Sequence, residues 1–538
     1  MKRKRLGVVT DGAFNAGLTV RLGPGCSTED LRIGDFVIVE GERICYFSMI
    51  SDIQLRATDP ALLANPPRDA SPFIAQALSG INTYATVQVK PMLMMEKGSE
   101  FAFTDELSPP QPVRTIPMHF AELCQADATD FATVFGKESK LNFAIGTPLT
   151  MDIPICIKLD RLVERSTGIF GQTGTGKSFL VRLLLCGIIK AGVAVNLIFD
   201  MHDEYAFGKR SEDGQWVKGL RHLFGSKVLV YSLDERAASR EGRNVDVTLK
   251  IGLNQIEAED VLLLADELDL TPTSRATVGL LHDTYGKDWL KQLLQMSPED
   301  IANFCDTKGA HPEATKALQR KLRDIGRLDY VVDNVPFSVI DEMVAALDKG
   351  KHIILHFGRY DRPLDHMLVA NIVTRRVRHL YQEKVERYEQ TQAAADEPRT
   401  LVITLEEAHK FLSPAVSRQT IFGTIAREMR KYYVTLMVVD QRPSGIDPEV
   451  LSQLGTRITG KLTEERDIEA VLTGVANRSF LRGALESLDT RQQVLLMGHA
   501  VPMPIQVQTR KYDEEFYKAM GAGESRNAMQ DIAELFGE

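Results

Sequence analysis

Short hydrophobic runs separated by Gly, Asp and Pro dominate the first part of the chain. LGVVT, GLTVRLG and GDFVIVEG lie between residues 6 and 55, and TYATVQVKPMLMM follows the proline-rich stretch NPPRDASP. Runs of this length with this punctuation are typical of β-strands. The pattern predicts a small β-barrel or sandwich over residues 1–140.

From residue 155 onward, apolar runs alternate with helical segments. The strand-like runs are NLIFD, KVLVYSL, HIILHFG, TLVITLEEAH and VTLMVVDQ. Strands that alternate with helices indicate a parallel sheet in an α/β fold. We therefore expect a nucleotide-binding core in two parts, residues 141–253 and residues 349–505.

The strand signal stops between these two parts. EAEDVLLLADELDL, ATKALQRKLRDIG and SVIDEMVAALDKG have the spacing of amphipathic helices. Residues 254–348 are therefore predicted to be a helical insertion. The last segment, 506–538, contains the charged helical texts RKYDEEFYKAMG and AMQDIAELFGE. It is expected to be a C-terminal arm that either packs on a neighbour or extends free.

Composition limits the class of protein. A chain of 538 residues with 44% hydrophobic content predicts two to four structural units. Its six cysteines form no CxxC or Cys/His cluster, which favours reduced thiols over zinc or iron–sulfur sites. The basic start MKRKR precedes too short an apolar run for a signal peptide, and there is no membrane span, so a cytoplasmic location is expected. The net charge of −9 argues against a surface coated in positive charge, but it leaves a basic channel open.

The stretch GQTGTGKS, residues 171–178, fits the phosphate-loop pattern GxxxxGK[ST] in full. The strand-like STGIF precedes it and the helical FLVRLLLCGIIK follows. Lys177 is expected to reach the β- and γ-phosphates, and Ser178 to hold Mg²⁺, so the predicted cofactors are ATP and Mg²⁺. The residues expected to surround the phosphates are Gly171, Thr173, Gly174, Thr175, Gly176, Lys177 and Ser178.

Hydrolysis also needs a carboxylate on the metal side and a group that activates water. Asp200 ends one apolar run, with His202, Glu204 and Tyr205 just beyond it, and Glu406 and Glu407 end another. Acidic residues at strand ends are often only helix N-caps, but two consecutive glutamates followed by Ala-His are less ordinary. We favour Glu407 as the water-activating carboxylate, with Glu406 or Asp200 serving the metal.

Further polar residues follow these strands. His409 either contacts the site or caps the next helix. Gln441 ends another apolar run, where it is a candidate sensor of the γ-phosphate or a turn residue. A cation that stabilises the transferring phosphoryl group often comes from a neighbouring subunit in oligomeric motors. Arg430, in a cluster with Arg427 and Lys431, and Arg165, just before the phosphate loop, are the candidates, although each on its own is an ordinary surface residue.

Taken in order, these motifs resemble the HerA family of hexameric ATPases, relatives of FtsK-type DNA translocases. The most specific parts are DMHDEY, close to the family's D-x-H-G-E-Y, the strand end EEAH, and QRPS followed by Ile-Asp. The chain departs from the family pattern at His202-Asp203, where His-Gly is usual, and at Thr404-Leu405 before the glutamates. Neither departure removes a required group.

The resemblance implies a RecA-like P-loop core, an N-terminal HAS-type barrel that supports ring assembly, and a homo-hexamer that draws double-stranded DNA through a central channel. It also implies Lys177 and Ser178 for phosphate and Mg²⁺, Asp200 for the metal side, Glu407 as catalytic glutamate, Gln441 as sensor, and Arg430, or else Arg165, as the trans-acting finger. Residues 208–222, which contain Lys209, Arg210, Lys218 and Arg221, are a candidate for the lining of the pore. The interleaved Glu212 and Asp213 also suit an ordinary solvated loop.

Three functions remain open. The first is a ring-shaped translocase or helicase that processes DNA ends with a NurA-like partner nuclease. The second is an ATP-regulated assembly platform in antiphage defence, which organises a sirtuin-like or nuclease effector. The third is a monomeric P-loop kinase or metabolic NTPase, which needs neither an oligomer nor a trans-acting arginine.

Overall fold

A computed structural model describes residues 3–59, 83–97, 109–210, 214, 216–234, 236, 245–335, 338–417 and 420–521. The proline-rich stretch at 65–72 and the helical text at 528–538 lie outside these residues. The chain divides into two units. The first unit comprises Met1–Lys158, Gly171–Lys177 and Thr456–Arg510, and the second comprises Leu159–Phe170, Ser178–Gly455 and Lys511–Glu538.

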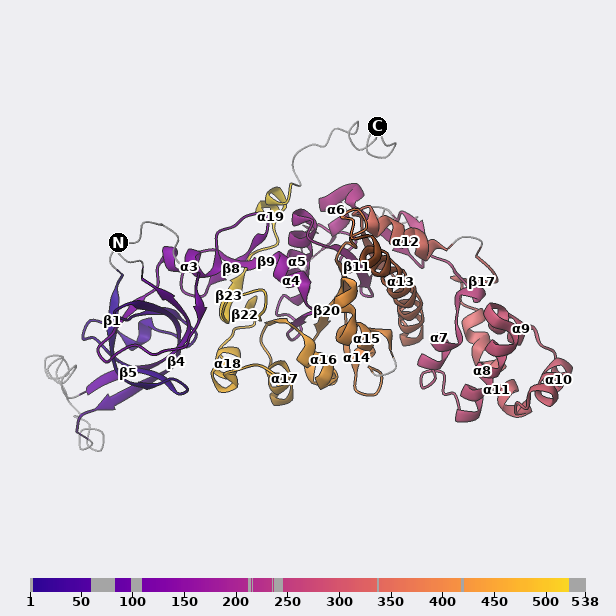
Figure 1. The fold of residues 1–538 in the computed structure, drawn as a ribbon, viewed down its shortest axis with the longest axis horizontal. Coiled ribbons are helices and arrows are strands. Elements are labelled where there is room, and N and C mark those ends of the chain that lie inside the picture. Colours follow the sequence, from indigo (N-terminus) through magenta and orange to yellow (C-terminus); the bar gives the residue numbers. More distant parts are fainter. Residues whose placement is uncertain are drawn as a thin grey trace. The chain divides into compact units, whose positions relative to one another are not determined.

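The N-terminal strands of the first unit close into an antiparallel barrel (Figure 1). The strands are β1 (Arg5–Ala13), β2 (Gly17–Leu22), β3 (Phe36–Glu40), β4 (Ile44–Ala57), β5 (Thr83–Glu96), β6 (Gln111–Pro112) and β7 (Glu122–Gln125). Their order is β2-β1-β7-β3-β4-β5-β6, and pairing of β2 with β5 closes the barrel. The connecting segments include η1 (Thr28–Asp30) and α3 (Ala128–Phe135). The predicted N-terminal β-barrel is confirmed.

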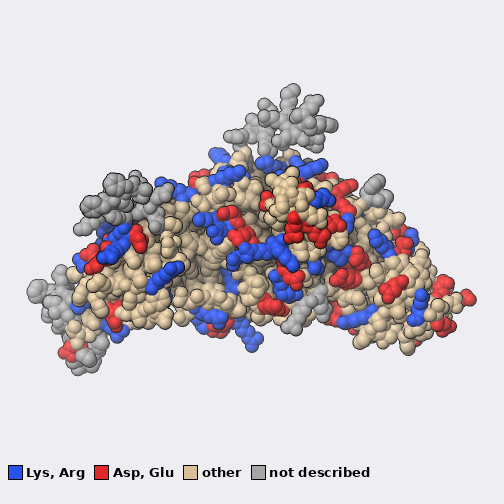
Figure 2. Space-filling model, viewed as in Figure 1, with Lys and Arg blue, Asp and Glu red and all other residues tan. Residues whose placement is uncertain are grey.

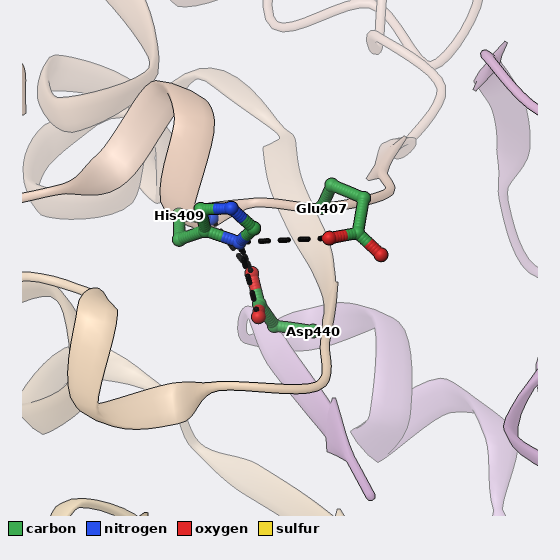
Figure 3. Close-up of side chains that lie close together, drawn as sticks. All are labelled: Glu407, His409 and Asp440. Atoms are coloured by element: carbon green, nitrogen blue, oxygen red, sulfur yellow. Dashed lines mark hydrogen bonds and ion pairs between the residues drawn. The ribbon is translucent and has the colours of Figure 1, made fainter. Parts of the chain in front are cut away.

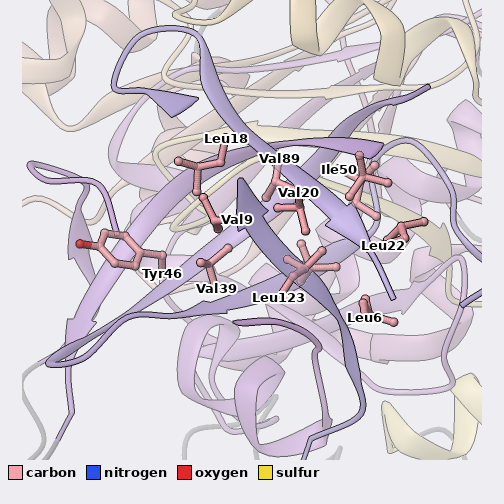
Figure 4. Packing of buried hydrophobic residues seen from close by; sticks show 12 residues of the cluster. Leu6, Val9, Leu18, Val20, Leu22, Val39, Tyr46, Ile50, Val89 and Leu123 are labelled. Carbon is pink, nitrogen blue, oxygen red and sulfur yellow. The ribbon is translucent and has the colours of Figure 1, made fainter. Parts of the chain in front are cut away.

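Alternating apolar side chains fill the barrel (Figure 4). Val20, Ile50, Val89 and Leu123 come from four different strands, and each side chain is fully buried. Side chains two residues apart on a strand face the same side, so the alternation seen in the sequence directs one set of residues inward. This burial holds the barrel together.

The first unit also contains a series of antiparallel strands in the order β21-β22-β23-β8-β9. These strands are β8 (Asn142–Pro148), β9 (Ile155–Lys158), β21 (Thr456–Thr459), β22 (Gln493–Gly498) and β23 (Ile505–Thr509), and the helices α17 (Glu465–Val471) and α18 (Arg478–Glu486) lie between β21 and β22 in the sequence. The predicted boundary between residues 505 and 506 therefore falls within β23. The text IQVQT forms a strand there because all of its side chains except that of Gln508 are buried while its backbone pairs with β22 and β8.

Parallel strands form the sheet of the second unit, in the order β15-β14-β18-β11-β19-β20-β10. They are β10 (Thr167–Phe170), β11 (Val195–Asp200), β14 (Val228–Ser232), β15 (Val247–Thr248), β18 (His352–His356), β19 (Leu401–Leu405) and β20 (Val434–Asp440). The central strands are buried along their whole length, as expected for a sheet covered on both faces. This confirms the predicted α/β fold.

Helices and short elements complete the second unit. The helices are α4 (Leu159–Glu164), α5 (Lys177–Ala191), α6 (Leu220–Phe224), α7 (Ala258–Leu263), α8 (Pro272–Tyr285), α9 (Trp289–Gln295), α10 (Pro298–Lys308), α11 (Pro312–Gly326), α12 (Val339–Asp348), α13 (Pro363–Thr391), α14 (His409–Leu412), α15 (Ile421–Glu428), α16 (Pro448–Gln453) and α19 (Glu514–Ala519). The short elements are β12 (Lys209–Arg210), β13 (Trp216–Val217), η2 (Gly225–Lys227), β16 (Ile251–Gly252), η4 (Leu253–Gln255), η5 (Gly286–Asp288), β17 (Val331–Val332), η6 (Met429–Tyr432) and η7 (Pro443–Gly445).

In the sequence, the helices α7 to α11 come between the strands β16 and β17, which pair with each other. These helices fall within the range predicted as a helical insertion (Figure 1). Proline at the first turn and side-chain caps from Thr271 and Ser297 start α8 and α10. Trp289 is fully buried among these helices and donates its indole N–H to the Ile256 carbonyl at 3.0 Å. By contrast, α12 contacts α13 and β18 of the sheet.

Charged side chains of both signs are interspersed on the face shown in Figure 2. This mixture agrees with a net charge of −9 that comes from 64 basic and 73 acidic residues. None of the helices in the described part of the chain is long and apolar enough to span a bilayer.

Candidate active site

The phosphate loop connects β10 to α5. Gly174 and Gly176 each have φ of +83°, in the left-handed region that glycine adopts without strain. The Thr175 hydroxyl donates to the Gln172 carbonyl at 2.7 Å, which folds the loop back on itself. A curled loop before a helix N-terminus directs backbone N–H groups at an anion. Lys177 and Ser178 are the first residues of α5, next to this curl.

Asp200, at the carboxyl end of β11, shapes the loop that follows it. Its carboxylate is fully buried and accepts backbone N–H groups from Glu204 at 2.7 Å, Tyr205 at 3.0 Å and Ala206 at 3.1 Å. Burial raises the pKa of Asp200, and the three backbone donors oppose that shift. Both carboxylate oxygens are thus engaged in fixing the backbone of the DMHDEY loop.

Glu204 lies beside Ser178. Its Oε1 is 3.3 Å from the ammonium nitrogen of Lys209, and its Oε2 is buried without a hydrogen-bond partner among the described residues. Burial on its own raises the pKa of Glu204. The neighbouring Ser178 hydroxyl and the Lys209 and Arg182 cations lower the pKa by more than burial raises it, so the net shift is downward. Glu204 belongs to the DMHDEY motif, but it was not among the residues predicted for the metal side.

Tyr205 and Glu406 form a buried pair. The Tyr205 hydroxyl donates to Glu406 Oε1 at 2.6 Å, and the two side chains come from the loop after β11 and the end of β19. Burial and the Glu406 charge raise the pKa of Tyr205 well above its ordinary value, so the phenol stays a neutral donor. This bond fixes Glu406 against the DMHDEY loop.

Glu407, His409 and Asp440 lie together at the ends of β19 and β20 (Figure 3). His409 Nδ1 is 3.0 Å from Asp440 Oδ2 and 3.7 Å from Glu407 Oε2. The Gln441 amide donates to Glu407 Oε1 at 3.3 Å. The Glu407 side chain is 22% exposed, unlike that of Asp440, which is fully buried. Because Glu406 is buried, Glu407 is the one of the two consecutive glutamates that water can reach.

The backbone at Glu407 is strained. Its φ of +46° lies in the left-handed region, which costs a non-glycine residue roughly 1–3 kcal/mol and recurs at functional sites. The next turn stabilises this conformation, because the backbone N–H of His409 donates to Asp440 Oδ2 at 2.7 Å. His409 therefore contacts the cluster, and it does not cap the following helix, because the N-cap of α14 is Ala408.

The pair of His409 and Asp440 predicts a pH-dependent contribution to stability. The hydrogen bond to Asp440 raises the pKa of His409 above 6.5; burial opposes the shift, and Glu407 adds to it. Because the folded pKa is the higher one, the stabilisation is fully present below about pH 6.5 and is lost as pH rises through the raised pKa. We expect His409→Gln to lower the melting temperature by roughly 2 °C at about pH 6 and by less at higher pH. Thermal melts of both proteins across pH test this, and a difference that grows with pH would contradict it.

The candidate arginines lie outside this cluster. Arg430 Nη2 is 2.6 Å from Glu164 Oε1, and the Arg430 side chain is 57% exposed. The exposed Arg165 lies against Gly455, where an added Cβ would be 2.6 Å from the arginine Cβ.

Most of the basic side chains proposed for a pore have acidic partners within the chain. Lys209 pairs with Glu204, and Lys218 lies 3.2 Å from Glu514. Arg221 is 2.9 Å from Asp246. Arg210 is exposed on β12, whereas Glu212 and Asp213 lie outside the described residues.

A phosphate loop between a parallel strand and a helix, with carboxylates at the carboxyl ends of the neighbouring strands, defines a P-loop NTPase, an enzyme that hydrolyses ATP. Residues 143–377 match the family described as Helicase HerA, central domain. The chain is similar to the HerA helicases over this range, which confirms the resemblance predicted from its motifs.

Individual relatives cover most of the chain. The DNA double-strand break repair helicase HerA of Sulfolobus acidocaldarius is 26% identical over 72% of this chain and 72% of its own length. The protein of the same name from Sulfurisphaera tokodaii is 26% identical over 82% of this chain and 84% of its own. Among solved structures, VirB4 of Thermoanaerobacter pseudethanolicus has a TM-score of 0.45 at 16% identity, and the match covers 71% of this chain and all of that one.

Proposed function

We propose that this protein is an ATP-driven translocase or helicase that acts on double-stranded DNA. It works with a partner nuclease or another effector in DNA-end processing or antiphage defence. The observation that carries the proposal is the position of Glu407. Its backbone is in a strained left-handed conformation, and its side chain accepts a hydrogen bond from Gln441 and lies beside the pair of His409 and Asp440. DNA is proposed as the substrate because similar proteins are named as DNA double-strand break repair helicases.

The chain's own residues divide the work of hydrolysis. Lys177 binds the β- and γ-phosphates within the curl of the phosphate loop. Glu407 orients the attacking water and accepts its proton, because its carboxylate is the accessible one of the pair. His409 and Asp440 hold Glu407 in place. Gln441 donates a hydrogen bond to Glu407 and acts as the sensor of the γ-phosphate.

Mg²⁺ fits the oxygen ligands beside the phosphate loop. Ser178 and the buried Oε2 of Glu204 are hard oxygen donors of the kind that this cation prefers. When bound, the cation neutralises negative charge on the phosphates. Because three backbone donors engage both carboxylate oxygens of Asp200, we assign the metal side to Ser178 and Glu204 rather than to Asp200. Asp200 then acts by shaping the loop.

The active form is proposed to be a hexameric ring. Six copies of a 60.0 kDa chain would place Arg430, or else Arg165, of one subunit at the nucleotide of the next. The exposure of Arg430 on η6 supports this assignment. Light scattering gives the mass of the particle, and a monomer at the concentration used for activity assays would contradict the ring.

DNA should stimulate ATP hydrolysis. We expect linear double-stranded DNA to raise the steady-state rate about fivefold or more, because a motor couples its track to its nucleotide site. The measurement compares rates with and without DNA, and Lys177→Ala, which lacks the phosphate-binding ammonium, is the blank. A rate that is indifferent to DNA would contradict the motor and would favour the ATP-regulated assembly platform.

A further inference from the structure

A buried arginine connects the C-terminal segment to the DMHDEY loop. Arg182 lies on α5, is 2% exposed, and donates its Nε to the Glu204 carbonyl at 2.8 Å. Its Nη2 makes a second, short hydrogen bond to the same oxygen. The guanidinium therefore fixes the backbone of the residue whose carboxylate lies beside Ser178.

Aromatic rings hold this guanidinium in place. Its carbon lies 5.4 Å from the ring centroid of Phe179 and 5.8 Å from that of Tyr512. At these distances a cation is attracted to an aromatic face, and the attraction strengthens when water is excluded. Phe179 belongs to α5 itself, but Tyr512 comes from the far C-terminal end of the described chain.

Tyr512 is in turn fixed by its surroundings. Its hydroxyl donates to the Lys218 carbonyl at 3.0 Å, and its own carbonyl accepts the Tyr517 hydroxyl at 3.3 Å. The rings of Phe516 and Tyr517 lie 5.4 Å and 5.0 Å from its ring. The ring against Arg182 therefore has a defined position.

The helix α19, which follows Tyr512, is fastened at both ends. Glu514 in its first turn pairs with Lys218 at 3.2 Å, and the Ala519 carbonyl at its end accepts Lys190 Nζ at 2.7 Å. Phe516, in the middle of this helix, is fully buried. Residues 511–521 are thus packed on their own chain, whereas the rest of the predicted arm, 522–538, lies outside the described residues.

We infer that residues 511–521 position the metal side of the nucleotide site through Tyr512 and Arg182. This inference rests on the proposed function, in which Ser178 and Glu204 hold Mg²⁺. Tyr512 and Arg182 are positioning residues, because they touch the loop backbone and not the nucleotide. Loss of the Tyr512 ring frees the Arg182 guanidinium, and the Glu204 carbonyl then loses its fixed donor.

The test compares Mg²⁺-dependent nucleotide binding in the wild type and in Tyr512→Ala. Outer groups that orient metal ligands typically contribute about 10- to 100-fold to metal affinity or activity. We expect Tyr512→Ala to need about tenfold more Mg²⁺ for half-maximal binding of a fluorescent ADP, with metal-free binding unchanged. Tyr512→Phe keeps the ring and should stay within about twofold of the wild type.

Lys190→Ala is the matched control, since it removes the contact at the other end of α19 and leaves Arg182 alone. If Tyr512→Ala does not fold, Tyr512→Leu, which keeps bulk without an aromatic face, replaces it. Unchanged Mg²⁺ dependence together with a lower melting temperature would overturn the inference, because the segment would then only stabilise the fold. Absence of ATP hydrolysis in the wild type would overturn the proposed function, and the binding assay would still decide on the positioning role.

Discussion

Glu407→Gln is expected to lower the rate of ATP hydrolysis by about 100-fold or more while ATP affinity stays within about threefold. The amide matches the carboxylate in size and can still accept the Gln441 hydrogen bond, but it cannot take a proton from water. Binding depends on the phosphate loop, which the substitution does not touch. Steady-state hydrolysis and equilibrium binding of ATP, measured on the same preparation, separate the two effects.

Glu406→Gln is the control for this prediction. The adjacent glutamate is buried and accepts the Tyr205 hydroxyl, so its amide should lower the melting temperature more than Glu407→Gln does. Its effect on hydrolysis should be the smaller of the two. If Glu407→Gln retains a near-normal rate and Glu406→Gln loses it, the roles of the pair are reversed.

The sequence predicted the parts of the site that depend on local pattern. Residues 171–178 form a curled loop before a helix because glycines at fixed spacing permit it. Glu407 and Gln441 come together because parallel strands place their carboxyl ends at one edge of the sheet. The sequence also favoured Glu407 over Glu406 as the water-activating carboxylate, and the burial of Glu406 supports that preference.

The departure from the family motif at residue 203 has a structural explanation. Asp203 has φ of +55°, a left-handed conformation in which glycine is the least strained residue. Aspartate is among the side chains that tolerate this region, and Asp203 Oδ1 lies 3.5 Å from His356 Nε2. The sequence shows the missing glycine, but only the backbone shows why glycine is usual there.

The proposed division of work between Asp200 and Glu204 does not follow from the sequence either. Asp200 has the strand-end position of a metal-side carboxylate, and the motif resemblance assigned it that role. Its oxygens are engaged because the loop turns back and directs three N–H groups at them. Such a turn depends on backbone geometry and on Arg182, which lies 22 residues from Glu204 in the sequence. Spacing along one strand therefore cannot distinguish a ligand from the residue that shapes the loop.

Asp200→Ala should separate these two roles. It leaves three backbone N–H groups without their acceptor, and an unsatisfied buried donor costs about 1–3 kcal/mol. Allowing for partial relaxation, we expect unfolding free energy to fall by roughly 3–5 kcal/mol, and hydrolysis to be lost as the loop changes shape. Chemical denaturation followed by far-UV circular dichroism measures the first effect.

Glu204→Gln is the matched comparison, because its backbone contacts remain and only the carboxylate beside Ser178 changes. It should leave stability within about 1 kcal/mol of the wild type and still lower Mg²⁺-dependent hydrolysis by about 100-fold. The opposite pattern, with Asp200→Ala stable but defective only in Mg²⁺ dependence, would return the metal side to Asp200. The two residues are close in sequence and share one loop, so stability rather than activity distinguishes the residue that builds the loop from the residue that the loop presents.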